Sequence, residues 1–247
     1  MASSLFLLNQ EGGVVDSLLC LPLVSQLLVV VSSDWDTVEG TLYRFQRHQL
    51  GEWEFVAPCI SVDLGKHGMS WGRGVFDLSH EQGVHKQEGD GKSPAGLFRL
   101  GPTFGNEFYQ PYVKNMPFLL ITEDLECVDD PHSVYYNQFV HTHSVGNQDW
   151  KSSEKMKEIG PLYAIGIAVQ HNLNPAKAGM GSAIFMHVLG KKGKGTAGCT
   201  AMEADHLREI VEWIDVRHQP CLVQLPIKEY LSKRSQWELP ELPVCSN

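Results

Sequence analysis

The hydrophobic and polar positions along the chain follow the pattern of a strand-rich protein. Short apolar runs, rich in β-branched and aromatic residues, are bounded by Gly, Pro and Asp, which is typical of β-strands separated by turns. These runs cover residues 26–33, 41–47, 52–56, 59–65, 95–101, 117–124, 163–172 and 182–190. The pattern therefore predicts a mainly β fold.

Helical periodicity is clear in one segment that follows Glu203. Leu207, Ile210, Val211 and Ile214 recur at intervals of three and four and form one apolar face, which predicts an amphipathic helix. Residues 151–159 are a second, shorter helix candidate. No internal repeat or clear linker interrupts the pattern, so we expect one mainly β domain with a few helices, of the α+β class.

Composition and charge narrow the classes of function. Hydrophobic residues make up 43% of the 247 residues and supply ample material for a core. The formal net charge of −9 argues against nucleic acid as a partner, because nucleic-acid-binding domains carry basic patches.

The most apolar segment, residues 17–31, is too short for a transmembrane segment and is interrupted by Pro22, Ser25 and Gln26. A signal peptide is poorly supported, because the first basic residue of the chain is Arg44. The six cysteines show no CxxC pair, and a dense disulfide framework is not expected in a chain with so much apolar material.

Cys199 stands out because of the residues around it. The predicted helix begins a few positions later, and Thr200 and Glu203 have the spacing of a capping box. His187 ends an apolar run twelve positions earlier, within reach of a loop that folds back. Since a helix N-terminus or a nearby histidine lowers a thiol pKa, Cys199 is a candidate nucleophile with His187 as its base.

Small residues precede this cysteine. Gly195, Ala197 and Gly198 allow a sharp turn and close approach of a substrate to the backbone. The backbone amides of Ala197, Gly198 and Cys199 are candidates for an oxyanion hole. The alternative is a buried and inert cysteine, as most cysteines outside disulfides are.

His141 and His143 are the strongest candidates for a metal site. Two residues apart on a strand, they share a face, and His171, Asp149 or Glu154 would have to supply a third ligand. Two polar positions at a strand end explain the pair more simply, so no metal ligand is assigned. Neither glycine-rich stretch, residues 89–98 or 190–196, matches a phosphate-binding loop, and no organic cofactor is expected.

Two motifs in this order resemble the L,D-transpeptidase catalytic domain, also called the YkuD domain. That family carries a histidine on a strand followed by Ser/Thr-x-Gly-Cys, which matches His187 and Thr196-Ala197-Gly198-Cys199. A Lys-Thr/Ser-Pro-x-Gly-x-Phe element matches residues 92–98. The resemblance spans about residues 25–225, and the chain looks like a periplasmic branch of this family. An N-terminal segment (1–24) and a C-terminal tail (226–247) lie outside it.

The resemblance implies a YkuD-like mixed β-sandwich that acts on peptidoglycan stem peptides outside the cytoplasm, in the periplasm or another extracytoplasmic site. It implies that Cys199 is acylated while His187 moves protons, without metal or cofactor. A backbone carbonyl, Ser182 and His171 are the candidates for orienting His187. Candidate substrate contacts are Thr196, Ser182, His171 and Trp150.

Other functions stay open. The chain departs from the family pattern where Thr200-Ala201-Met202 replaces a hydrophobic residue and an arginine after the cysteine, and the His–Cys spacing is shorter than in many members. Water could replace the acceptor amine, which would make the protein a peptidoglycan amidase or L,D-carboxypeptidase-type hydrolase. A noncatalytic peptidoglycan-binding module and a zinc peptidase that uses His141 and His143 are the further alternatives.

Overall fold

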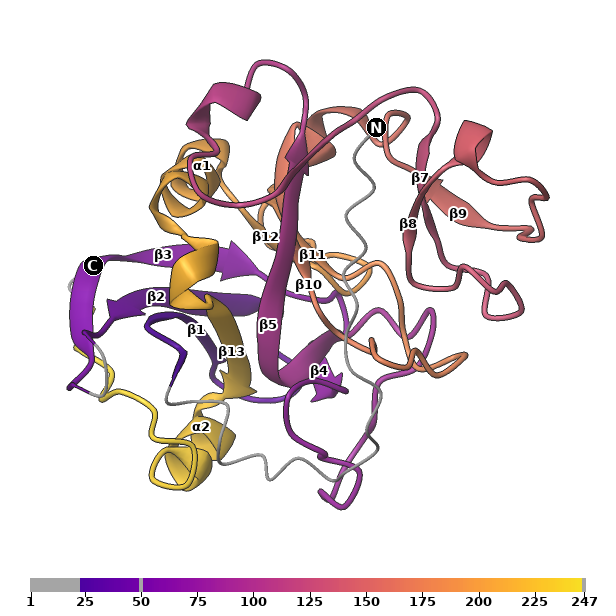
Figure 1. Ribbon diagram of the computed structural model, residues 1–247. Helices are drawn as coiled ribbons and strands as arrows, with labels where there is room; N and C mark the ends of the chain where they lie inside the picture. Colours follow the sequence, from indigo (N-terminus) through magenta and orange to yellow (C-terminus); the bar gives the residue numbers. More distant parts are fainter. Residues whose placement is uncertain (1–22, 49–50, 246–247) are drawn as a thin grey trace.

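The computed structural model describes residues 23–48 and 51–245 (Figure 1). Nearly all of the predicted N-terminal segment, residues 1–22, lies outside the described residues. Ten strands form one sheet in the order β10-β11-β12-β3-β2-β1-β13-β5-β4, with β6 on β5. Because β10 also pairs with β5, the sheet closes on itself.

The sheet mixes parallel and antiparallel pairs and closes on itself, where the resemblance implied a mixed β-sandwich. β1 (Gln26–Ser32) pairs antiparallel with β2 (Glu39–Gln46) and parallel with β13 (Cys221–Pro226). All seven residues of β1 are buried, which explains its continuous run of Leu and Val. The prediction of a mainly β fold with few helices is confirmed, with two α-helices among the described residues.

The remaining strands extend or surround this frame. Residues 52–56 and 59–65, expected as two strands, form the single strand β3 (Glu54–Asp63). The long strand β5 (Ser93–Gly105) carries short strands on its sides. These and the rest of the closed sheet are β4 (Met69–Trp71), β6 (Phe118–Leu120), β10 (Ile165–Val169), β11 (Phe185–Val188) and β12 (Thr200–Met202).

A separate three-stranded sheet stands beside the closed sheet (Figure 1). It contains β7 (Leu125–Val128), β8 (Phe139–His141) and β9 (Ser153–Lys155) in the order β8-β7-β9. The helix predicted over residues 151–159 is wrong, because Ser153–Lys155 pairs with β7 instead. Pairing of Glu126 with Lys155 and of Cys127 with Glu154 outweighs the weak helical pattern.

The helices pack on the closed sheet. The amphipathic prediction is confirmed by α1 (Ala204–Trp213), which buries Leu207, Ile210 and Val211 and packs against β10 and β11. α2 (Ile227–Lys233) packs against β13 and β1, and Tyr230 and Trp237 join the main core. Cys245 forms a disulfide with Cys59 of β3, a bond that the sequence analysis did not predict.

Candidate active site

Cys199 lies directly before β12, which pairs in parallel with β11. The capping box expected at Thr200 and Glu203 is wrong. Thr200 begins a strand, and its hydroxyl donates to the side-chain oxygen of Gln224 at 2.6 Å. Helix α1 begins only at Ala204, and Glu203 at its N-cap makes no side-chain cap bond. The helix N-terminus therefore lies beyond a strand and does not adjoin the thiol.

The loop before Cys199 is shaped by Thr196. Its Oγ1 donates to the Cys199 carbonyl at 2.7 Å and accepts from the Gly198 amide at 3.0 Å. Gly195 has φ of +67°, and a Cβ there would lie 2.6 Å from the Lys66 Cα, so glycine is required on both grounds. Because the Gly198 amide is already used inside the loop, Ala197 and Cys199 remain the amide candidates for an oxyanion hole.

The second motif, residues 92–98, is joined to this loop by buried hydrogen bonds. Ser93, fully buried, donates to the Cys199 carbonyl at 3.0 Å and accepts from the Gly65 amide at 2.8 Å. Gln224 donates to the Pro94 carbonyl at 2.9 Å while it accepts from Thr200. The two motifs, about a hundred positions apart, thus form one structural unit.

The thiol of Cys199 is buried, with 6% of the residue exposed. Sγ accepts from the Phe185 amide at 3.3 Å and donates to the Ala183 carbonyl at 3.5 Å. Burial raises the pKa of this thiol to about 12, with the nearby Glu154 adding to the rise. The Phe185 amide and Lys86 act in the opposite direction. The resting thiol is therefore neutral near pH 7.

His187 lies on β11 and faces the same side as Phe185, two positions earlier. Extending the β11–β12 register by one residue places Cys199 opposite Phe185, so thiol and imidazole lie on one face. Their Cα atoms are then roughly 8 Å apart from strand rise and spacing. No hydrogen bond joins the two side chains among the described residues, because Sγ contacts the Phe185 amide and the Ala183 carbonyl while Nδ1 contacts the Val188 carbonyl.

The imidazole of His187 is held by a backbone carbonyl. Nδ1 lies 2.8 Å from the carbonyl oxygen of Val188, which can only accept, so Nδ1 carries the proton and Nε2 has a lone pair. The Tyr163 ring packs edge-on at 5.5 Å between centroids. Burial lowers the pKa of His187, which keeps the ring neutral. Of the three candidates for orienting His187, the carbonyl is the one the structure brings to it.

Ser182 and His171 have other partners. Ser182 donates to Glu88 at 2.9 Å. His171 is 1% exposed, with Nε2 donating to the Met180 carbonyl at 3.0 Å and Nδ1 accepting from the Arg73 amide at 3.3 Å. Burial lowers the pKa of His171 to about 3. These bonds tie His171 to the loop around Met180 rather than to His187.

Trp150 lies in the loop before β9 and packs against the small sheet. It packs with Val128 and Val140 in a cluster separate from that of Cys199, and its Nε1 donates to Glu126 at 2.8 Å. Only 5% of the residue is exposed, so the structure gives Trp150 a core position in the small sheet.

Buried ionisable groups near Cys199 are the main feature that sequence reasoning missed. Glu154 accepts from the Tyr163 hydroxyl, and burial raises the pKa of Glu154 to about 7, with Asp129 and Glu88 adding to the rise. Asp129 Oδ1 is buried and has no hydrogen-bond partner among the described residues. Pairing of β9 with β7, a long-range contact, places Glu154 opposite Cys127, so no local pattern could have shown the cluster.

A buried ion pair lies next to the glycine loop. Lys86, 3% exposed, contacts Asp90 at 2.5 Å. A Cβ at Gly198 would lie 3.8 Å from the Lys86 Cε, and a Cβ at Gly181 would lie 3.0 Å from its Cγ. Lys86 therefore packs against the glycine loop, and its charge partly offsets the rise in the thiol pKa.

The structure gives other partners to all three candidates for the third ligand of a His141–His143 metal site. Asp149 accepts from Ser133 and the Val134 amide, Glu154 from Tyr163, and His171 is tied to Met180. Asp124, which the sequence analysis did not consider, lies beside both histidines instead.

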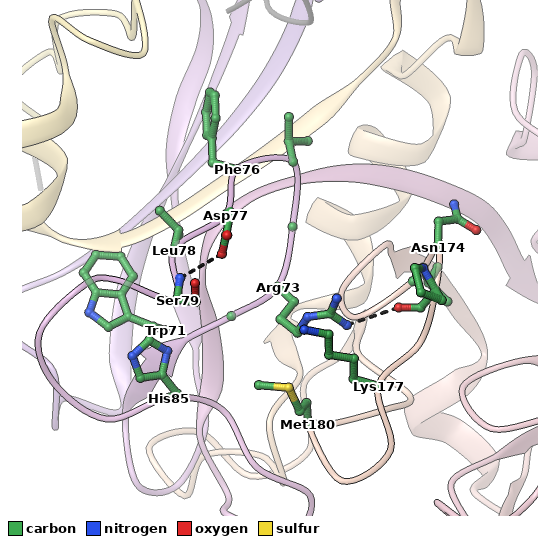
Figure 2. A pocket seen from close by; sticks show the side chains of 15 residues that line it. Trp71, Arg73, Phe76, Asp77, Leu78, Ser79, His85, Asn174, Lys177 and Met180 are labelled. Carbon is green, nitrogen blue, oxygen red and sulfur yellow. Dashed lines mark hydrogen bonds between the residues drawn. The ribbon is translucent and has the colours of Figure 1, made fainter. Parts of the chain in front are cut away.

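Two pockets lie around residues 173–175. One of about 670 Å³ is lined by Trp71, Arg73, His85, Lys177 and Met180 among others, and Figure 2 shows the Arg73 and Lys177 side chains next to each other there. The other, of about 590 Å³, is lined from the small sheet's loops, including Ser133, Tyr136 and Gln138. Cys199 and His187 line neither of them.

The fold and the two joined motifs agree with a family comparison. The model of the YkuD family, described as the L,D-transpeptidase catalytic domain, matches residues 34–223. The chain belongs to the L,D-transpeptidase catalytic domain family. No curated protein and no solved structure matches the chain. Membership of this family supports an enzymatic role in peptidoglycan chemistry. Among the described residues, no helix has the length and apolarity needed to cross a membrane.

Proposed function

We propose that the protein is a cysteine-dependent acyltransferase that acts on peptidoglycan stem peptides through a thioester at Cys199. The observation that carries the proposal is the placement of the family's two motifs. The β11–β12 register, extended by one residue to Cys199, supports a thiol on the same face as His187, and Ser93 of the second motif hydrogen-bonds to the Cys199 carbonyl.

The proposed mechanism starts from a neutral pair. The thiol rotates away from the Ala183 carbonyl, and His187 Nε2 takes its proton while sulfur attacks the carbonyl carbon of the stem peptide. His187 remains oriented by its Nδ1–H bond to Val188 and later returns the proton to the leaving amine. An acceptor amine or water then attacks the thioester and restores the thiol. The amides of Ala197 and Cys199 are the proposed donors to the oxyanion.

Neutral groups suit this mechanism better than a preformed ion pair. Burial raises the pKa of Cys199 and lowers that of His187, so both shifts oppose a resting thiolate–imidazolium pair. Proton transfer must therefore accompany attack. We infer that substrate binding brings the thiol and imidazole into hydrogen-bond contact.

An extracytoplasmic location is part of the proposal. The disulfide between Cys59 and Cys245 supports it, because such bonds persist mainly in oxidising compartments. The substrate of the family lies in the same compartment.

A noncatalytic peptidoglycan-binding module is the second candidate. The observation that favours it is the burial of the thiol together with its raised pKa, which a binding module would tolerate and an enzyme must overcome.

Product analysis separates these functions. The wild type, Cys199→Ala and the control Cys221→Ala, which alters a buried cysteine on β13, are incubated with tetrapeptide-bearing muropeptides, with and without an added acceptor amine. Crosslinked products in the wild type and the control, but not in Cys199→Ala, support transpeptidation, and trimmed products support the hydrolase. Bound but unchanged muropeptides in all three proteins would replace the enzyme with the binding module.

A further inference from the structure

One end of the small sheet brings together three potential metal ligands from different segments. Asp124 directly precedes β7, His141 is the last residue of β8, and His143 lies in the 3₁₀ turn Thr142–Ser144. Leu125 pairs with His141, and the Thr142 amide donates to the Asp124 carbonyl at 2.9 Å. This backbone pairing fixes the two histidines beside the carboxylate. One ligand atom from each residue lies within 4.8 Å of the others.

The side chains already converge on one point. Nδ1 of His141 lies 3.1 Å from Asp124 Oδ2, and Nδ1 of His143 contacts the same oxygen. The two rings are 5.6 Å apart between centroids. Thr122 donates to the other carboxylate oxygen, Oδ1, at 2.7 Å and holds the carboxylate in place. A hydroxyl that orients a ligating carboxylate is a usual feature around metal sites.

The cluster is also open to solvent. The side chains of His141, His143 and Asp124 are 40%, 72% and 29% exposed. An ion can therefore enter without rearrangement of the core, and water can fill the remaining coordination positions.

We propose that Asp124, His141 and His143 bind a divalent transition-metal ion such as Zn²⁺. Two imidazoles and one carboxylate suit Zn²⁺, Ni²⁺ or Cu²⁺, whereas Ca²⁺ and Mg²⁺ prefer sites made of oxygen atoms. Ligands at about 2.0–2.2 Å in tetrahedral geometry lie roughly 3.3 Å apart, so small side-chain rotations suffice. Each neutral imidazole moves its proton from Nδ1 to Nε2 and offers the Nδ1 lone pair. The site is independent of acyl transfer at Cys199.

Calorimetric titration tests the site. ZnCl₂ is titrated into full-length Cys199→Ala protein, so that the proposed nucleophile cannot bind metal. The same titration is made with two double variants, in which Asp124→Asn or His143→Ala is combined with Cys199→Ala. The matched control is His132→Ala, because His132 is also exposed and pairs with a single carboxylate, Asp130, at 3.2 Å.

One equivalent of Zn²⁺ should bind to the Cys199→Ala protein and to the His132→Ala control, with at least tenfold weaker binding in the other two variants. Circular dichroism without metal shows whether each variant is folded. Zinc-edge anomalous scattering from crystals of the wild type soaked in Zn²⁺ gives an answer that depends on no variant. Absence of saturable binding, equal affinity in all variants, or anomalous density elsewhere would overturn the proposal and leave a hydrogen-bonded cluster.

Discussion

The two hydrogen bonds to the Cys199 carbonyl predict a measurable coupling between the two family motifs. Ser93→Ala removes one donor to this carbonyl and leaves the Gly65 amide, which Ser93 accepts from, without its partner. A buried unsatisfied donor costs about 1–3 kcal/mol of unfolding free energy. For a chain of this size, this corresponds to a decrease in Tm of roughly 3–9 °C. The carbonyl itself is still satisfied by Thr196.

Thr196→Val removes the other donor and leaves the Gly198 amide unpaired. Each single variant keeps one hydrogen bond to the Cys199 carbonyl, and only the double variant loses both. The double variant should therefore be less stable than the sum of the two singles by about 1 kcal/mol or more, because the buried carbonyl is then unsatisfied.

Urea unfolding of the wild type, both singles and the double variant measures this coupling. Ser232→Ala is the control, since Ser232 is exposed and bonds only within its own turn, and its unfolding free energy should stay within about 0.5 kcal/mol of the wild type. Effects that add to within about 0.3 kcal/mol would refute the shared role of Ser93 and Thr196 at this carbonyl.

Three further predictions concern charge and crosslinks. Burial raises the pKa of Glu154 to about 7, so the folded state holds more protons than the unfolded state between pH 4.5 and 7, and stability falls as pH rises through this range. Glu154→Gln should flatten this dependence and stabilise the protein at pH 8 by up to about 3 kcal/mol, reduced by solvent screening. An unchanged pH profile of Tm in this variant would contradict the prediction. Lys86→Met should lower the unfolding free energy by about 3–5 kcal/mol, because Asp90 loses its cation and keeps only hydrogen bonds from the Gln87 and Lys92 amides and the Ser70 hydroxyl. Lys155→Met, which breaks an exposed pair with Glu158, should change it by less than about 1 kcal/mol. Equal effects of the two variants in urea unfolding would exclude a special role for the buried pair. Cys59→Ser should cost about 2–5 kcal/mol in nonreducing buffer and nothing further when reductant is added; a wild type insensitive to reductant would argue against the disulfide.

The strand-rich fold was predictable because its signals are local. The run of Leu and Val in β1 and the three-to-four spacing of Leu207, Ile210 and Val211 in α1 each depend on neighbouring residues alone. The weak prediction at residues 151–159 is wrong because the partner strand β7 lies far away in the sequence. The capping-box prediction at Thr200 is wrong because pairing with β11 and with the distant strand β3 sets that segment.

The candidate site likewise combines features that are visible in the sequence with features that depend on long-range strand pairing. The motifs around Cys199 and residues 92–98 were visible as sequence, but their connection through Ser93 and Gln224 depends on sheet order. Glu154 near the thiol and Asp124 between His141 and His143 come from strand pairing within the small sheet. Long-range pairing brings such residues together, and a single sequence carries no local record of it.

The most direct test of the central claim is the intact mass of the protein after brief incubation with tetrapeptide muropeptides. We expect the wild type to gain the mass of an acyl group, and Cys199→Ala to gain none under the same conditions. His187→Ala should show an adduct that forms at least a hundredfold more slowly, since general base catalysis contributes about 10²–10⁴-fold. No adduct on the wild type during turnover, or an equal adduct on Cys199→Ala, would contradict acyl transfer through this cysteine.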